Sequence, residues 1–246
     1  KARWCFLKSD YNTINPFAGA IAGRVVSGGE PDLGAAPDLA FVPASLLDEA
    51  RGYRERTIAR NSGAGGGASQ YIALAQSAAA EGDMDGVVRF YAMAAASDPA
   101  QSLLWTELSR GSLAYVTQDE AMLRSLRSVA ISAAINAYQT SRTASARADS
   151  LAVLGEALVR SETWRPALAA YRASLEIAEV PALRAEYEDL RATHGFRVVD
   201  NTIDADSETP RVCVQFSEEL IPGQDYSSFV SIDGASDVAI ETDAGQ

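Results

Sequence analysis

Few side chains in this sequence have the type and spacing that catalysis or metal binding requires. The two cysteines, Cys5 and Cys213, lie at opposite ends of the chain, and neither belongs to a Cys-x-x-Cys pair. His194 is the single histidine, so the sequence offers no credible set of nitrogen and sulfur ligands for zinc. We interpret both cysteines as disulfide-bonded or buried thiols rather than as reactive nucleophiles.

The other motifs that could indicate catalysis are absent or incomplete. The sequence contains no nucleophile elbow, phosphate loop, zinc-protease motif or dinucleotide-binding motif. The glycine-rich run from Gly63 to Gly67 lacks the lysine and the preceding strand of a phosphate loop, so we interpret it as a linker. His194 falls in the last turn of a predicted helix, where the helix dipole favours an ordinary exposed imidazolium. We therefore expect no catalytic residue.

Two acidic residues and three tryptophans are the remaining candidates for binding a ligand. Asp204 and Asp206 could hold calcium, but their spacing does not match an EF-hand loop, and a solvated acidic linker is the better interpretation. Trp4, Trp105 and Trp164 are expected in the core rather than as platforms for a ligand. The sequence thus predicts no metal site and no cofactor.

Charge is distributed unevenly along the 246 residues, whose formal net charge is −12. Residues 1–198 carry 22 acids and 20 bases, whereas residues 199–246 carry 11 acids and one base, Arg211. An acidic surface repels nucleic acid and anionic membranes, so neither is expected as a partner. No apolar run approaches the ~20 residues that a membrane helix needs.

The middle of the sequence is predicted to form helical repeats, which would position any binding surface of this protein. Residues 68–101 have the pattern of one 34-residue tetratricopeptide-like unit, with a turn at Gly82-Asp83. Tyr71 of that unit is followed 34 residues later by Trp105, which starts a second unit with a long second helix at 119–141. A third unit follows, with Leu154 on its first helix, Trp164 at its turn and Tyr171 on its second helix. An ordinary helical bundle is the alternative interpretation.

The repeat pattern also predicts which residues are buried and where helices begin and end. A first helix is expected at 44–60, opened by a capping box of Ser45 and Asp48. A closing helix should start at Pro181 and end at Gly195 in a left-handed cap. The side chains predicted to be buried are Leu74, Tyr91, Trp105, Leu108, Leu154 and Tyr171.

Short strands are predicted at both ends, so the expected fold class is mainly α, a tetratricopeptide-like helical-repeat array with short β segments at both termini. Alternating apolar residues predict strands at 3–7, 20–26, 211–216, 229–233 and 238–242. The last strand has nothing after it to complete a sheet, so we expect a piece of a larger protein. The predicted domains are residues 1–27, a linker with one helix at 28–67, a helical domain at 68–196 and the start of a β-sandwich at 197–246.

Two terminal segments resemble a known architecture. Residues 3–9 with Pro16 and residues 19–23 resemble the closing strands of a PAN/apple domain, in which a cysteine before Phe-Leu-Lys-Ser pairs with an upstream one. Residues 210–220, with Asp225-Tyr226 and Phe229-Val230 after them, resemble the first macroglobulin-like domain of bacterial alpha-2-macroglobulin proteins. That order, with helices between, is similar to the N-terminal region of such a protein.

The resemblance implies a location and a role. The family entraps proteases outside the cytoplasm, often through a Cys-x-Glu-Gln thioester, and neither that motif nor a bait region occurs in this sequence. We therefore expect a non-catalytic scaffold segment of a periplasmic or extracellular protease inhibitor, with protein partners. The resemblance makes Cys5 and Cys213 disulfide candidates whose partners lie outside the chain. The alternative is a free-standing tetratricopeptide adaptor for envelope assembly or chaperone-type binding.

Overall fold

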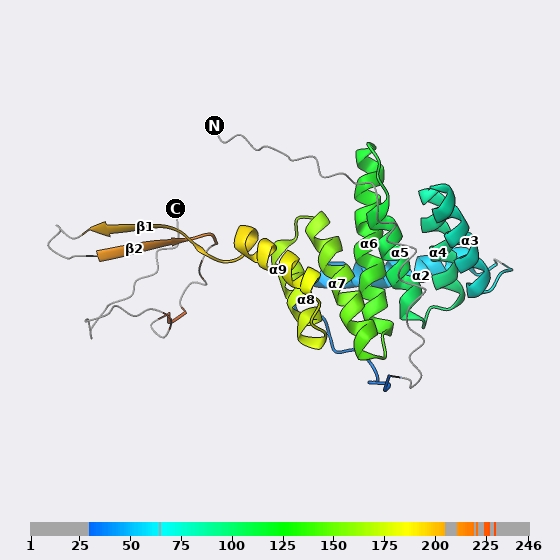
Figure 1. Ribbon diagram of the computed structural model, residues 1–246, viewed down its shortest axis with the longest axis horizontal. Helices are drawn as coiled ribbons and strands as arrows, with labels where there is room; N and C mark the ends of the chain where they lie inside the picture. The colour runs from blue at the N-terminus through cyan, green and yellow to red at the C-terminus, as the bar shows by residue number, and fades with distance from the viewer. Residues whose placement is uncertain are drawn as a thin grey trace.

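The computed structural model describes residues 30–63, 65–204, 211–218, 220, 224–226 and 229. This part of the chain is mainly helical and ends in a two-stranded hairpin (Figure 1). The helices are α2 (Ala44–Asn61), α3 (Ala68–Glu81), α4 (Met84–Ser97), α5 (Ser102–Ala114), α6 (Glu120–Thr140), α7 (Ala144–Arg160), α8 (Trp164–Ile177) and α9 (Pro181–His194), and the strands are β1 (Val198–Asp204) and β2 (Arg211–Phe216).

Consecutive helices pack as pairs along one direction (Figure 1). The most extensive contacts are those of α3 with α4, α5 with α6 and α7 with α8, and further contacts join each pair to the next. Such hairpins cannot bury an apolar stripe alone, so they stack. None of the helices in the described residues combines the length and apolarity that crossing a membrane would require.

The turn between α3 and α4 forms where the sequence predicts it. Gly82 has φ +76°, a left-handed conformation that glycine adopts without steric cost. Asp83 then caps α4 by accepting a hydrogen bond from the Gly86 amide at 2.9 Å. This tight connection brings α4 back along α3.

Most of the side chains predicted to be buried form the core. Tyr91, Trp105, Leu108, Leu154 and Tyr171 are all at most 4% exposed, which confirms their prediction.

The prediction for Leu74 is wrong, because this side chain is 39% exposed. On α3 the inward stripe consists of Tyr71, Ala75 and Ala78, at i, i+4 and i+7. Leu74 precedes Ala75 by one position, which turns it about 100° away from that stripe.

Helix α2 crosses the paired helices and packs on α4 and α6. It begins at Ala44 after Pro43, and no side chain caps it, so the predicted capping box of Ser45 and Asp48 is wrong. Asp48 instead forms an ion pair with Arg51 on the exposed side of the helix. Ahead of α2, the expected linker contributes Leu39 and Val42 to the core.

Helix α9 begins at Pro181 as predicted, but it does not end in a left-handed glycine. Gly195 has φ −76° and ψ 163°, because the chain continues directly into extended structure. The last carbonyls of the helix are satisfied instead by the Gly195 amide on Arg191 (2.9 Å) and by Arg197 on Thr193 (2.7 Å).

The hairpin contains one predicted strand and one that the sequence did not suggest. Strand β2 matches the expected strand at 211–216, whereas β1 forms in the segment interpreted as an acidic linker. The two strands are antiparallel, with Ile203 opposite Val212 and Asn201 opposite Val214. Phe229 lies in a turn, its amide bonded to the Tyr226 carbonyl at 2.9 Å. The strands expected at 3–7, 20–26, 230–233 and 238–242 lie outside the described residues.

Candidate functional site

The residues predicted to carry disulfide or metal chemistry do not come together in the described part of the chain. Cys213 lies on β2, opposite Thr202, as an exposed free thiol, and Cys5 lies outside the described residues. Asp204 ends β1, whereas Asp206 is also outside. Among the described residues, no group of three or more histidine, cysteine, aspartate or glutamate side chains could hold a metal ion.

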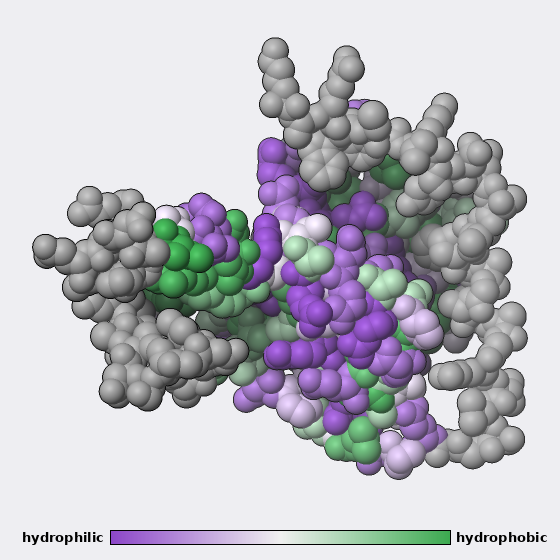
Figure 2. Space-filling model, turned by 60° about the vertical axis from the view of Figure 1, so that its left-hand side comes forward, coloured by the Kyte–Doolittle hydropathy of each residue, from purple (hydrophilic) through white to green (hydrophobic). Residues whose placement is uncertain are grey.

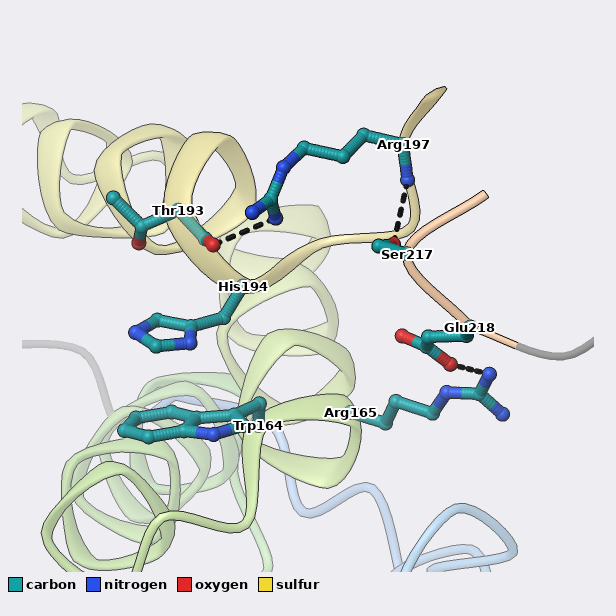
Figure 3. A pocket seen from close by; sticks show the side chains of 7 residues that line it. All are labelled: Trp164, Arg165, Thr193, His194, Arg197, Ser217 and Glu218. Carbon is teal, nitrogen blue, oxygen red and sulfur yellow. Dashed lines mark hydrogen bonds and ion pairs between the residues drawn. The ribbon is translucent and has the colours of Figure 1, made fainter. Parts of the chain in front are cut away.

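His194 lies in a shallow, open pocket of about 440 Å³ where α8 and α9 meet the hairpin (Figure 3). Its imidazole stacks on the Trp164 indole, with ring centroids 3.8 Å apart and an angle of 12° between the planes. Trp164 is therefore a half-buried pocket residue, unlike Trp105, which is fully buried and donates its indole N–H to the Pro99 carbonyl at 3.1 Å.

Most of the polar groups that line this pocket hold the hairpin against the helices. Arg165 forms an ion pair with Glu218, and Arg197 donates to backbone carbonyls at the end of α9 (Figure 3). The Ser217 hydroxyl accepts from the Arg197 amide at 3.1 Å and donates to the Gly195 carbonyl at 3.3 Å. These contacts join the hairpin to the helices. Among the residues that line the pocket, they do not connect a nucleophile to a base and the base to an orienting group.

Two stacked phenylalanines complete this joint. Phe196 and Phe216 have ring centroids 5.0 Å apart and an angle of 13° between their planes. Beyond them, apolar side chains of both strands stay exposed, including Ile203 (69%) and Val212 (53%). Figure 2 shows apolar side chains gathered beside the mainly hydrophilic surface of the helices.

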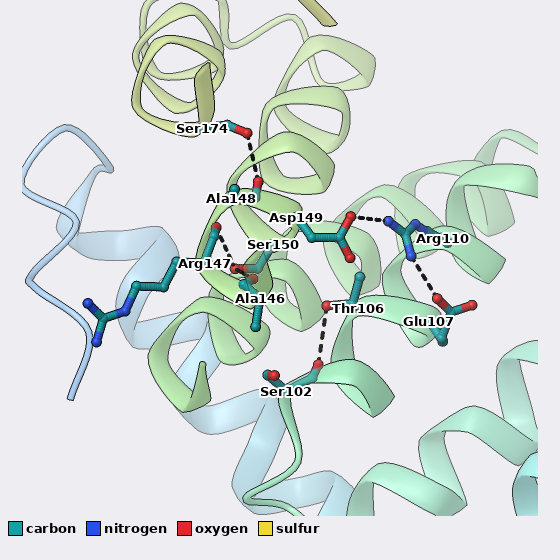
Figure 4. A network of polar contacts seen from close by, with 10 residues as sticks. All are labelled: Ser102, Thr106, Glu107, Arg110, Ala146, Arg147, Ala148, Asp149, Ser150 and Ser174. Carbon is teal, nitrogen blue, oxygen red and sulfur yellow. Dashed lines mark hydrogen bonds and ion pairs between the residues drawn. The ribbon is translucent and has the colours of Figure 1, made fainter. Parts of the chain in front are cut away.

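A second polar cluster bridges two helices that belong to different pairs (Figure 4). Arg110 of α5 bonds Glu107 one turn earlier at 2.7 Å, and its other terminal nitrogen forms an ion pair with Asp149 of α7. Their side chains are 31% exposed for Arg110, 11% for Glu107 and 42% for Asp149. The cluster therefore links α5 to α7 while remaining accessible to solvent.

Burial and charge at this cluster raise the pKa values of Arg110 and of the neighbouring Tyr91. Burial opposes the charged form of Arg110, but the Asp149 and Glu107 carboxylates outweigh it and raise the pKa of the guanidinium. Burial, together with the negative charge of Glu107, raises the pKa of Tyr91 to about 12. Tyr91 therefore stays neutral at physiological pH, and Arg110 stays fully charged.

The opposite side of α7 carries a different contact. Arg147 points away from Asp149 and donates to the carbonyls of Gly34 (2.7 Å) and Ala35 (3.0 Å) in the segment before α2 (Figure 4). Helix α7 is thus covered by the N-terminal segment on one side and joined to α5 by the ion pair on the other.

Further along, a glutamate on α7 lies in a partly desolvated position. Burial raises the pKa of Glu156, and the nearby Glu186 adds to the effect, while Arg160 and Arg110 oppose it. Burial also raises the pKa of Tyr171, and the negative charges of Glu186 on α9 and of Glu156 add to this effect.

Sequence reasoning missed the cluster around Arg110. The spacing of Glu107 and Arg110, three residues apart on a predicted helix, could have suggested a pair. Asp149 lies 39 residues beyond Arg110, and its participation depends on how α7 stacks on α5, which no local pattern specifies. No protein-family model matches the chain, and no curated protein matches it. What the chain does must therefore be inferred from its own residues.

Proposed function

We propose that this chain is a non-catalytic helical scaffold that binds other proteins through the side of α5 and α7 that carries Arg110. One observation supports this proposal most strongly. The ion pairs of Arg110 with Glu107 and Asp149 join two helix pairs, and the side chains of Arg110 and Asp149 stay 31% and 42% exposed there. Stacked helical hairpins create extended surfaces of this kind.

The chemistry of that surface suits protein recognition. Arg110 presents fixed donors between two carboxylates, and an arginine in such a setting is a typical anchor at protein interfaces. Leu103, 54% exposed, lies one and two turns before Glu107 and Arg110 on the same face of α5. The surface therefore combines an exposed apolar residue with an ordered charge.

We also propose that the helix pairs form a tetratricopeptide-like array. The 34-residue interval from Tyr71 to Trp105 supports it, because both side chains are buried at the start of successive pairs. Helices α3 and α4 have 14 residues each, as that repeat expects, whereas α6 has 21. The array is therefore irregular in its second unit.

The wider setting is part of the same proposal. The chain would belong to a periplasmic or extracellular alpha-2-macroglobulin-like protease inhibitor, a setting supported by the similarity of residues 210–220 to its first macroglobulin-like domain. A free-standing tetratricopeptide adaptor is the alternative. The length of the full gene discriminates between the two proposals. A protease inhibitor of this family predicts many further β domains after Gln246, whereas a free-standing adaptor predicts few residues after Gln246.

The binding surface can be tested by site-specific photocrosslinking in the native host. A photoreactive residue in place of Leu103 should crosslink to a protein. Met122 on α6 is the control: it is also exposed (39%), but a photoreactive residue in its place should not crosslink. Replacing Arg110 with Ala should remove the Leu103 crosslink. Equal crosslinking at both positions, or none at Leu103, would contradict the proposed surface.

A further inference from the structure

The hairpin of β1 and β2 has one apolar face, which is exposed. Opposite residues of an antiparallel pair of strands point to the same face. Ile203 pairs with Val212 and Asn201 with Val214, and Phe216 shares this face because it alternates with the two valines along β2. The exposed fractions are 69% for Ile203, 53% for Val212 and 45% for Val214, so the described helices leave this face open.

The other face of the hairpin is polar. Thr202 pairs with Cys213 there, and Asp200 pairs with Gln215. Such alternation is typical of an antiparallel sheet that packs on one side and meets water on the other. A two-stranded hairpin is at best marginally stable by itself. The apolar face therefore calls for a cover that the described residues do not supply.

The sequence that follows the hairpin has the composition of such a cover. After β2 the chain makes a tight turn, in which the Phe229 amide donates to the Tyr226 carbonyl at 2.9 Å. Two short stretches beyond this turn alternate as the hairpin does, with apolar residues at 230 and 232 in the first and at 238 and 240 in the second. Each stretch could present one apolar side to the hairpin.

Charge argues against a second copy of the chain as the cover. Residues 199–246 carry 11 acids and one base, so two copies of this end repel each other. Residues of the same chain meet the same repulsion, but their tether holds them at an effective concentration on the order of mM. The segment that directly follows the hairpin is therefore the favoured occupant.

We propose that residues 230–242 fold back over the hairpin, with the apolar side chains of this segment packed against Ile203, Val212 and Val214. The hairpin then belongs to a small β unit whose apolar face is covered by the chain itself and not by a partner protein. This inference concerns the β end of the chain, goes beyond the proposed function and does not depend on it.

The first test compares the maleimide labelling of two thiols on opposite faces of β2, in chains that carry Cys5→Ser. One chain keeps Cys213 on the polar face, and the other carries Cys213→Ser with Val214→Cys on the apolar face. Each rate is divided by the rate of the same thiol in urea. The thiol at position 214 should react about tenfold more slowly than Cys213, because labelling it requires the covering segment to open.

Deleting the proposed cover should abolish this difference. Without residues 230–246, the thiol at position 214 should react as fast as Cys213. The matched control lacks only residues 243–246 and should keep the slow rate at position 214.

Two point variants make the same comparison without a deletion. In the full chain with Val214→Cys, Ile240→Ser should speed labelling, because Ile240 belongs to the apolar side of its stretch. Glu241→Ser, at the adjacent position on the polar side, should leave the rate unchanged.

Three results would overturn the proposal. Equal rates at positions 213 and 214 in the full chain mean that the apolar face is open. A slow rate at position 214 that persists without residues 230–246 means that another part of the chain covers it. Protection at position 214 that rises with protein concentration identifies a second copy as the cover.

Discussion

Gly155 of α7 lies directly against the Tyr171 ring of α8, so that a β-carbon at Gly155 would fall 2.2 Å from the Tyr171 Cδ1 atom. The close approach of these two helices depends on the missing side chain. Tyr171 is 3% exposed and fills the space between the helices. This contact fixes how the third helix pair closes.

Gly155→Ala should therefore destabilise the protein despite the higher helix propensity of alanine. Overpacking costs typically 1–3 kcal/mol, and the propensity gain returns ~1 kcal/mol at most. Gly52→Ala on α2 is the control, because its β-carbon would meet only the end of the flexible Arg56 side chain. Urea denaturation should show a lower midpoint for Gly155→Ala and an unchanged or higher one for Gly52→Ala.

Tyr171→Ala tests the same contact from the other side. Removing a large buried aromatic ring costs ~3–5 kcal/mol. The thermal midpoint of this variant should fall by many degrees, whereas Phe229→Ala, at an aromatic residue that is 78% exposed, should change it little. An unchanged midpoint for Tyr171→Ala would show that the ring is not part of the core.

The Arg110 cluster should contribute little to stability, because part of it faces solvent. Asp149→Asn should cost less than about 1 kcal/mol, and high salt should reduce the cost. The Asp48–Arg51 pair is about two-thirds exposed on both sides, so Asp48→Asn should have no measurable effect. A large, salt-independent loss for Asp149→Asn would mean that the cluster supports the fold rather than a binding surface.

Glu156 makes stability depend on pH in a definite direction. Its pKa is raised in the folded protein above the ordinary 4.5, so the folded state binds the proton more tightly than the unfolded state. Its favourable contribution is present below pH 4.5 and is lost as the pH rises through the folded pKa. Glu156→Gln should therefore raise the thermal midpoint relative to wild type at pH 7 and not at pH 4.

A matched glutamine substitution separates this effect from a general change in charge. Glu176 on α8 has a 70% exposed side chain, so Glu176→Gln should show no gain that appears only at pH 7. Equal gains for both variants at pH 7 would indicate long-range charge repulsion rather than desolvation of Glu156.

The exposed thiol on β2 should react without unfolding. Native chain treated with a maleimide should be modified at Cys213, and Cys213→Ser should lose that product. We also predict no bond between Cys5 and Cys213, since the two segments are predicted to belong to different domains. Intact mass under non-reducing conditions checks this, and the loss of two hydrogens within one chain would contradict it.

Periodic patterns predicted the helices well because local physics determines them. The turn at Gly82-Asp83 follows from a glycine that tolerates positive φ, and the start of α9 follows from Pro181, whose φ is fixed near the helical value. Leu74 was wrongly predicted to be buried because the repeat pattern assigns buried positions by comparison with another unit. The buried stripe of α3 actually consists of Tyr71 and two alanines.

The parts that failed depend on contacts between distant residues. Strand β1 reads as an acidic linker and forms because β2 pairs with it. The ion pair of Arg110 with Asp149 and the bond from Asn136 to Ala50 span 39 and 86 residues, respectively. Neither is encoded by local spacing, so both contacts became visible only with the packing of the helices.

The most direct test of a non-catalytic scaffold compares three proteins in protease inhibition: the full-length protein, this chain alone, and the full-length protein without residues 68–195. We predict that the chain alone inhibits no protease and turns over no substrate, and that the deletion impairs localisation or partner docking more than inhibition. Two results would contradict the scaffold role. One is stoichiometric inhibition of a protease by the isolated chain, and the other is turnover of a substrate that persists after contaminating enzymes have been removed.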